Sequence, residues 1–481
     1  MVRIRGTELD AATRAFLSAN AVRGACLFRN NMQDAAQLTR LNDDLRAVMG
    51  ESALIALDQE GGAVVRATWV PAPPSAMALG AADDIDLARR TGAAVGRAVK
   101  ALGFNWNFAP VLDLNNNPRN PIIAERSFGA DPQRATELAL AWMAGSESAG
   151  VACCVKHFPG HGDTSVDSHR DLPTVDKPPA ELERFELAPF RQAAAHAPAM
   201  MTAHIVYPTL DAELPATMSR KILTDLLRGQ WQYQGVIITD DMAMHAIAHR
   251  FGAGHAAVMA LAAGADMVTA LGSPENQEAT IAAIAAAIDD GTLERADVDA
   301  KLRRLDALAA RHPCATGAYP QDGADRVVMA EGWRRALTVK GAPHAPAAGA
   351  RVRLVMRQDR ASDGVSEPGV PAAELAASLG RLYQVDLITY ADADHFDWAS
   401  LPADGVFTIL ASTSRLRYGP AAKAAFKPDL HLALWNPYQA LDIDAPALIT
   451  YGFAAPALEA VNGWLLGAIE AGARAPVPGF R

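Results

Sequence analysis

The segment from Lys156 to His169 gathers side chains that can donate, accept and transfer protons. Within it, Asp167 and His169 stand two residues apart in a polar stretch. A carboxylate beside an imidazole fixes the tautomer of the ring and stabilises its protonated form. Such a pair can protonate a leaving oxygen and then take a proton from water. The spacing therefore predicts an acid–base pair at Asp167 and His169, and the alternative is a solvated loop pair without a function.

The same segment could instead bind a metal ion. His157 and His161 have the i, i+4 spacing of paired metal ligands, and Asp163 and His169 could complete the set. That spacing places two ligands on one face only if the residues between them are helical. Pro159-Gly160 interrupts a helix at this point. We therefore expect no metal ion here, and no part of the sequence suggests a cofactor.

A second reactive segment is the apolar run Gly235–Thr239, which ends in Asp240 and Asp241. Hydrolysis of a glycosidic bond with retention needs a carboxylate nucleophile below the anomeric carbon. A carboxylate at the end of a strand is held rigidly, as a nucleophile must be. Adjacent residues of a strand diverge, so we expect one aspartate to face a pocket and the other to cap the next helix.

Several further polar residues follow apolar runs and could bind sugar hydroxyls. One carboxylate can accept two hydrogen bonds from neighbouring hydroxyls, and cationic or imidazole groups can donate to the same ring. The predicted substrate-binding residues are Asp58, Arg126, Lys156, His157 and His204. For Arg126 a structural ion pair with Glu125 or Asp131 is the alternative.

The elements that must position these residues alternate between short apolar runs and longer helical patterns. The predicted strands are Arg23–Phe28, Ala53–Leu57, Asn105–Leu112, Val151–Val155, Ala199–Ile205, Gly235–Thr239 and Ala265–Thr269. Helical periodicity lies between most of them, for example over Asp86–Leu102 and Gln133–Ser148. Polar residues follow five of these strands, as expected of a (β/α)₈ barrel, in which active sites lie at the carboxyl ends of the strands. A doubly wound sheet would place them at one switch point only.

A second domain is expected after the barrel. The stretch from His312 to Gly323 is rich in Pro, Gly and Ala and lacks periodicity, which is typical of a connection between domains. Five strand-like runs follow, separated by helix-like ones. We predict a catalytic barrel over residues 1–315, a linker over 316–335 and a smaller α/β sandwich domain over 336–481.

The composition limits the classes of partner. The formal net charge is −10 and no run of basic residues offsets it, which argues against nucleic acid. The N-terminal residues lack an apolar signal segment, and no apolar window reaches a membrane span, so we expect a cytoplasmic protein without a membrane partner. Cys153 and Cys154 are neighbours in a predicted strand and point to opposite faces, so buried free thiols are expected for the four cysteines.

Taken together, the ordered motifs resemble glycoside hydrolase family 3, in particular its β-N-acetylglucosaminidase (NagZ-like) branch. The motifs that carry the resemblance are Leu27-Phe28-Arg29-Asn30, Asp58-Gln59-Glu60-Gly61-Gly62, Phe108-Ala109-Pro110-Val111-Leu112-Asp113, Glu125-Arg126-Ser127-Phe128-Gly129, Lys156-His157-Phe158-Pro159-Gly160-His161-Gly162, Asp167-Ser168-His169, Met201-Thr202-Ala203-His204 and Thr239-Asp240-Asp241-Met242. They cover about residues 24–270. The chain departs from the family pattern at Ala63, where arginine is common, while Arg66 is retained. It also carries the insert Asn115–Pro121 of the longer members.

The resemblance implies a barrel followed by an α/β sandwich domain, with Asp240 as the nucleophile. It implies that His169, oriented by Asp167, is the acid–base residue, because this branch uses a histidine on a loop. The β-glucosidase branch takes an acid–base glutamate from its second domain instead. Asp58, Arg126, Lys156 and His157 would bind the sugar.

The leading hypothesis is an exo-acting hydrolase of terminal β-linked N-acetylglucosamine, a small carbohydrate substrate, with a role in recycling peptidoglycan (muropeptide) fragments. A second is a phosphorylase, because a histidine acid–base residue does not repel phosphate as a carboxylate would. A β-glucosidase-type hydrolase and a barrel that only binds sugar are the remaining alternatives.

Overall fold

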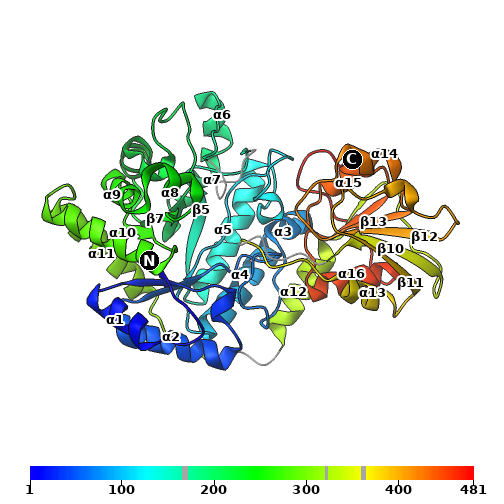
Figure 1. The fold of residues 1–481 in the computed structure, drawn as a ribbon, viewed down its shortest axis with the longest axis horizontal. Helices are drawn as coiled ribbons and strands as arrows, with labels where there is room; N and C mark the ends of the chain where they lie inside the picture. The colour runs from blue at the N-terminus through cyan, green and yellow to red at the C-terminus, as the bar shows by residue number, and fades with distance from the viewer. Residues whose placement is uncertain (165–171, 320–322, 359–364, 481) are drawn as a thin grey trace.

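The computed structural model describes residues 1–164, 172–319, 323–358 and 365–480 and contains two β-sheets (Figure 1). The first sheet is an eight-stranded parallel barrel in which each strand pairs with the next along the chain. A parallel bridge between Val2 and Ala270 closes it. Its strands are β1 (Val2–Arg3), β2 (Gly24–Cys26), β3 (Leu54–Leu57), β4 (Trp106–Asn107), β5 (Ala152–Phe158), β6 (Ala199–Thr202), β7 (Val236–Asp241) and β8 (Met267–Thr269). The predicted barrel is thus confirmed.

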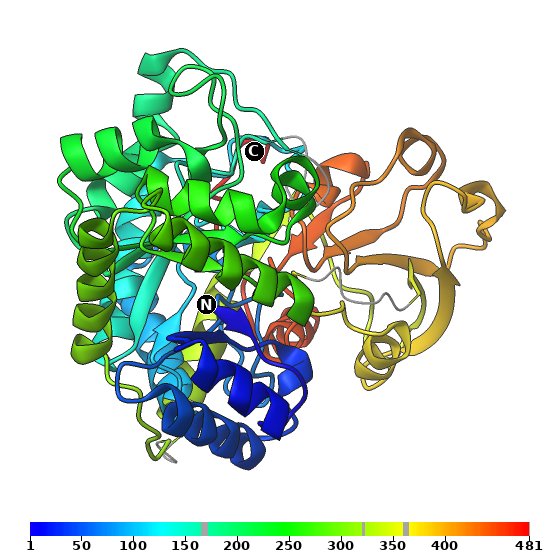
Figure 2. The ribbon, with the colours of Figure 1, turned by 60° about the vertical axis from the view of Figure 1, so that its left-hand side comes forward.

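Helices surround the barrel, as Figure 2 shows. They are α1 (Ala11–Ala19), α2 (Ala35–Met49), α3 (Ala76–Ala82), α4 (Ile85–Ala101), α5 (Pro132–Ser148), α6 (Pro179–Arg184), α7 (Leu187–Ala193), α8 (His245–Phe251), α9 (Ala253–Ala263), α10 (Pro274–Asp289) and α11 (Arg295–Arg311), with short helical turns at Arg29–Asn31, Ala124–Arg126 and Ala216–Met218 and a π-helix at Lys221–Gln230. Several begin at a side-chain cap, for example Asp131, which accepts from the backbone of Arg134 at the start of α5.

Residues alternate along each strand between the barrel interior and the helical layer. Leu54, Ala56 and Cys154 belong to the interior cluster, whereas Ile55 and Cys153 belong to the cluster beneath the helices. The opposite orientation expected for Cys153 and Cys154 is therefore confirmed, and all four cysteines are buried and free. Residues Leu305, Leu308 and Ala309 of α11 join the interior cluster.

Several barrel strands differ from the sequence predictions. Strand β4 covers only Trp106–Asn107 of the predicted Asn105–Leu112, β6 ends at Thr202 instead of Ile205, and β7 continues past Thr239 to Asp241. Strand β1 was not predicted, because two residues are too few to show an alternating pattern. Strand β5 was predicted to end at Val155 but continues to Phe158. A register shift after Val155 restores pairing between Phe158 and Thr202 of β6, so Lys156 and His157 are strand residues rather than the first residues of a loop.

The second sheet has six strands in the order β11-β10-β12-β13-β14-β9. All neighbours are parallel except β9, which runs antiparallel at one edge. Its elements are β9 (Thr338–Lys340), β10 (Arg351–Arg357), α13 (Ala372–Leu379), β11 (Gln384–Tyr390), β12 (Phe407–Ser412), α14 (Pro420–Ala425), β13 (Leu430–Ala433), α15 (Gln439–Asp442), β14 (Ala447–Ile449) and α16 (Ala455–Leu465). Separate apolar clusters cover its two faces, one including α13 and α16 and the other α14, as expected of an α/β sandwich.

The two sheets are joined through a shared apolar cluster and through α12 (Ala324–Arg335). Met77 and Ala78 of α3 lie in one buried cluster with Trp333 of α12 and with Tyr451, which follows strand β14 of the second sheet. Helix α12 contacts both α4 and α16. Much of the predicted linker is therefore a packed helix, and the domain boundaries stay a prediction. Among the described residues, none of the helices has the length and apolar character that a membrane span needs.

Candidate active site

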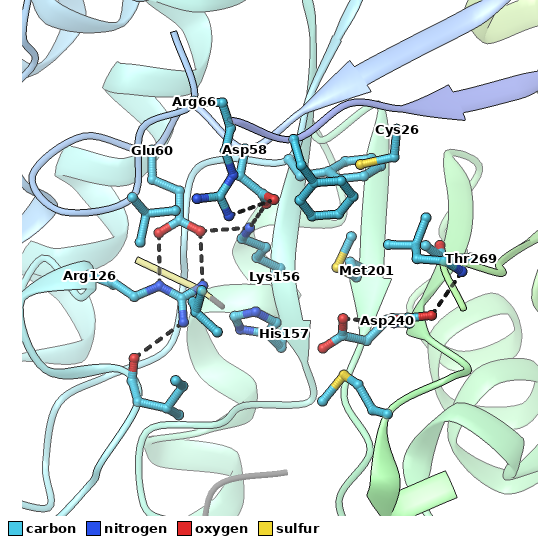
Figure 3. A pocket seen from close by; sticks show the side chains of 18 of the residues that line it. Cys26, Asp58, Glu60, Arg66, Arg126, Lys156, His157, Met201, Asp240 and Thr269 are labelled. Carbon is cyan, nitrogen blue, oxygen red and sulfur yellow. Dashed lines mark hydrogen bonds and ion pairs between the residues drawn. The ribbon is translucent and has the colours of Figure 1, made fainter. Parts of the chain in front are cut away.

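One pocket, with a cavity volume of about 200 Å³, opens at the carboxyl ends of the barrel strands. Its lining comes from widely separated segments, as a barrel site requires. Figure 3 shows the arrangement of ten of these residues. The lining includes Arg3, Cys26, Phe28, Asp58, Glu60, Arg66, Arg126, Lys156, His157, His161, Met201, Asp240, Asp241, Met244, Thr269, Leu271 and Val365.

A cluster of ion pairs forms one wall of the pocket (Figure 3). Lys156 Nζ lies 2.7 Å from Asp58 Oδ1 and 2.6 Å from Glu60 Oε1. Arg126 donates through Nε and Nη2 to the two oxygens of Glu60, each at 2.9 Å. Arg66 Nη2 lies 3.4 Å from Asp58 Oδ2. Because each group holds another, all five side chains are oriented before a ligand enters.

The charges of this cluster stabilise one another. Burial alone would raise the pKa of Asp58 and Glu60, but Lys156 with Arg66 and Arg126 holds both below their ordinary values. Burial likewise opposes the charge of Lys156, but Asp58 and Glu60 raise its pKa above the ordinary value. The pocket wall therefore presents fixed charged donors and acceptors, which suits a ligand rich in hydroxyl groups.

Asp113 organises the segment between Lys156 and the predicted acid–base pair. Its Oδ2 lies 2.6 Å from His157 Nδ1, and its Oδ1 accepts from the backbone N–H groups of His157 and His161 at 3.1 and 2.7 Å. On the other side, Asn120 Nδ2 donates to the carbonyl of His161 at 2.8 Å and to Thr164 Oγ1 at 3.2 Å. Burial, with a smaller effect from His157, lowers the pKa of His161 to about 4, so its ring is neutral at pH 7.

Asp240 and Asp241 end β7 on the wall opposite the ion-pair cluster, and both line the pocket. Asp240 points into the space facing Lys156 and His157 in Figure 3. Asp241 Oδ1 accepts from the backbone of Leu271 at 3.0 Å, which ties β7 to the loop after β8. Asp241 therefore stabilises the strand ends, and the expectation that it caps the next helix is wrong, since Met244 is the residue at the start of α8.

His204 lies behind this wall. Its Nε2 is 3.0 Å from the carbonyl oxygen of Asp241, and its Nδ1 is 2.9 Å from Thr217 Oγ1. The side chain is buried and is not among the residues lining the pocket. The assignment of His204 to substrate binding stays a prediction. In the structure its contacts support the backbone of Asp241.

Comparisons with known proteins identify the family. The model of the "Glycosyl hydrolase family 3 N terminal domain" matches residues 1–308. The chain belongs to glycosyl hydrolase family 3.

Relatives within family 3 extend the similarity. A "Beta-hexosaminidase A" of Pseudoalteromonas piscicida is 36% identical over 337 residues, which cover 64% of this chain but only 56% of that protein. A "Beta-hexosaminidase" of Thiobacillus denitrificans is 37% identical over 66% of this chain and 88% of its own length. A solved family 3 β-N-acetylglucosaminidase of a Paenibacillus species superposes with a TM-score of 0.90 at 32% identity, covering 99% of this chain and 97% of that one. The last match includes both sheets.

Of the residues assigned from the family 3 motifs, Asp58, Arg126, Lys156, His157 and Asp240 lie together in the pocket. Asp167 and His169 lie outside the described residues, so their roles stay predictions. Asp163 precedes that segment and Lys177 follows it. Lys177 Nζ lies 2.7 Å from Asp163 Oδ2, and this ion pair holds the two residues together. Within the described part of the chain, no group of three or more His, Cys, Asp or Glu side chains is arranged to hold a metal ion.

Three residues of the site were not assigned from the sequence: Glu60, Arg66 and Asp113. Glu60 lies in the motif Asp58-Gln59-Glu60-Gly61-Gly62, and Asp113 ends the motif Phe108-Ala109-Pro110-Val111-Leu112-Asp113. Both motifs follow apolar runs, and this position is the signal that could have identified the two residues. Arg126 was expected to pair with Glu125 or Asp131 if it were structural, but it pairs with Glu60, 66 positions away. Long-range pairs of this kind leave no local signal in a single sequence.

Proposed function

We propose that this family 3 chain is a retaining exo-β-N-acetylglucosaminidase that forms a covalent glycosyl-enzyme intermediate on Asp240. One observation carries the proposal: Asp240 faces the Asp58–Lys156–Arg126 cluster across a single pocket. A nucleophile on one wall and fixed hydroxyl-binding groups on the other suit a single terminal sugar held with its anomeric carbon at Asp240. The hexosaminidase relatives support the activity class.

Two displacements at the anomeric carbon make up the proposed reaction. Asp240 attacks that carbon while His169, oriented by Asp167, gives its proton to the leaving oxygen, and the first glycosidic bond breaks. His169 then takes a proton from water, the water oxygen bonds to the same carbon, and Asp240 leaves as a carboxylate. Two inversions give overall retention. The assignment of Asp167 and His169 rests on the family resemblance.

The residues beside Asp240 fit an N-acetyl group. C2 of the sugar is bonded to the anomeric carbon, so its substituent lies next to the nucleophile. Met201, Met244 and Leu271 line the pocket with apolar surface, and the backbone N–H of Leu271 donates to Asp241, the neighbour of Asp240. Such surface suits the methyl of an acetamido group better than a bare hydroxyl.

Aryl β-glycosides that differ only at C2 test this function, each assayed with and without phosphate. We expect the N-acetylglucosaminide to be cleaved with a kcat/KM at least about 100-fold above that of the glucoside, which corresponds to about 3 kcal/mol. Free N-acetylglucosamine should be the product at every phosphate concentration. Preference for the glucoside would point to the β-glucosidase branch, and phosphate-dependent formation of the sugar 1-phosphate would identify a phosphorylase; either result contradicts the proposal.

For the cellular role, we propose turnover of cell-wall fragments in the cytoplasm, on the strength of the NagZ-like motifs. The substrate would then be a muropeptide carrying a terminal N-acetylglucosamine. Incubation with a purified muropeptide digest and analysis by mass spectrometry should reveal loss of one N-acetylhexosamine. Cleavage of chitin oligosaccharides but not of muropeptides would contradict this role.

A further inference from the structure

The second domain contributes a loop to the rim of the barrel pocket. Val365 lines the pocket, and the backbone N–H of Glu367 donates to the carbonyl of Ala63 at 2.8 Å. Glu367 Oε1 lies 3.5 Å from Arg66 Nη1, and the Glu367 side chain is 17% exposed to solvent. Ala63 is the position at which this chain departs from the arginine common in the family. A carboxylate of the second domain thus reaches the substrate-binding cluster.

The contact with Arg66 fixes which end of the sugar Glu367 faces. Arg66 also lies 3.4 Å from Asp58, within the cluster that stands opposite Asp240 (Figure 3). With the anomeric carbon held at Asp240, the far side of the ring carries the C4 and C6 positions. Glu367 does not itself line the pocket, but through its contact with Arg66 it lies behind the end of the site that faces these positions.

Charge at this end of the pocket depends on Glu367. Asp58 and Glu60 provide two negative charges against the three positive charges of Lys156, Arg66 and Arg126. Glu367 brings the sum over these six groups to zero. Burial raises the pKa of Glu367, and Arg66 with the neighbouring Arg29 opposes that shift. Without this carboxylate the site would carry excess positive charge beside the C4 and C6 positions, where an anionic ester would be attracted.

We propose that Glu367 is a specificity-determining residue that excludes substrates carrying a phosphate or sulfate ester on C4 or C6 of the terminal sugar. Its carboxylate repels such an ester and occupies Arg66, the cation that would otherwise bind it. The inference rests on the proposed function, because it places the anomeric carbon at Asp240. Within that function it assigns the second domain a part in choosing the substrate.

The test compares 4-nitrophenyl N-acetyl-β-glucosaminide with its 6-sulfate ester in the full-length wild type, in Glu367→Gln and in Glu374→Gln. Glu374 lies on the exposed side of α13, away from the pocket lining. Glu374→Gln is the control, because it removes the same charge from the same domain. We expect Glu367→Gln to raise the ratio of kcat/KM for the ester over the unmodified substrate at least about 10-fold. Glu374→Gln should keep the wild-type ratio, and Glu367→Asp, which retains the charge, should stay within about three-fold of it.

An unchanged ratio in a folded Glu367→Gln variant would overturn the proposal. So would loss of turnover that azide restores on good leaving groups, because that result would make Glu367 the acid–base residue. Inhibition of the wild type gives a test that needs no variant: N-acetylglucosamine 6-phosphate should bind at least about 10-fold more weakly than N-acetylglucosamine, and equal or tighter binding would contradict the proposal. Failure of the proposed function would look different, since the wild type would then not cleave the unmodified substrate.

Discussion

Replacing Arg415 by methionine tests whether the second domain stabilises the sugar-binding turn of the barrel. Arg415 follows β12 in the second domain, and its Nη2 donates to Glu125 Oε1 at 3.1 Å. The two side chains are only 5% and 1% exposed. Glu125 precedes Arg126 in the turn Ala124–Arg126, so this buried pair holds the residue that orients Glu60.

The expected cost follows from burial. Removing one partner of a buried ion pair leaves the other charge unpaired in a low-dielectric site, which costs about 3–5 kcal/mol. The guanidinium also lies over Trp435, 5.4 Å from the ring centroid, and that contact contributes on the order of 1 kcal/mol. We therefore expect Arg415→Met to lower the free energy of unfolding by about 4 kcal/mol. Activity should fall as well, because Arg126 loses the support of its neighbour.

Urea unfolding of a double-mutant cycle measures the pair directly. Arg415→Met combined with Glu125→Gln should be more stable than the sum of the single changes by about 2–3 kcal/mol, because no buried charge is left without a partner. Arg351→Met serves as the control, since Arg351 pairs with Asp386 at the exposed edge of the same domain and should cost less than about 1 kcal/mol. A loss below about 1 kcal/mol for Arg415→Met, or additive effects in the cycle, would refute the reasoning.

Three further predictions concern the barrel residues. His161 has a folded-state pKa of about 4, below its unfolded value of about 6.5, so its contribution to stability is present above pH 6.5 and is lost as pH falls towards 4. In unfolding titrations, the wild type should lose about 2 kcal/mol more stability between pH 7 and pH 5 than His161→Gln does. Lys156→Met removes the cation between Asp58 and Glu60 and should lower kcat/KM by roughly 30- to 150-fold in steady-state assays, whereas a change under about three-fold would exclude a binding role. At Gly162 an added Cβ would lie 1.6 Å from the carbonyl oxygen of Leu114, so Gly162→Ala should cost about 1–3 kcal/mol by calorimetry, and an unchanged melting temperature would argue against this packing.

The fold was predictable because its signals are local. Runs such as Ala53–Leu57 and Gly235–Thr239 are short, apolar and followed by a polar residue, and the structure places β3 and β7 there. Strand β1 escaped prediction because Val2–Arg3 pairs only through contacts made far along the chain, with β2 and with Ala270. The end of β5 was missed for a related reason, since a register shift that depends on β6 carries the strand past Val155.

The site was predictable where residue types matched ordered motifs, and less so where partners are distant. Asp58, Lys156 and Asp240 could be assigned from motif and strand position. The pairing of Arg126 with Glu60 and the approach of Glu367 to Arg66, 301 positions apart, depend on tertiary structure alone. No periodicity or spacing in the sequence specifies which loop of the second domain reaches the barrel.

The most direct test of the central claim is to trap the intermediate on Asp240. A fluorinated N-acetylglucosaminyl fluoride, which forms the glycosyl-enzyme faster than it is hydrolysed, should add the mass of one sugar to the protein. Peptide mapping is expected to place that mass on Asp240 at the end of β7, and Asp240→Ala should take up none. Label on another residue, or stable labelling of the Asp240→Ala variant, would contradict the account.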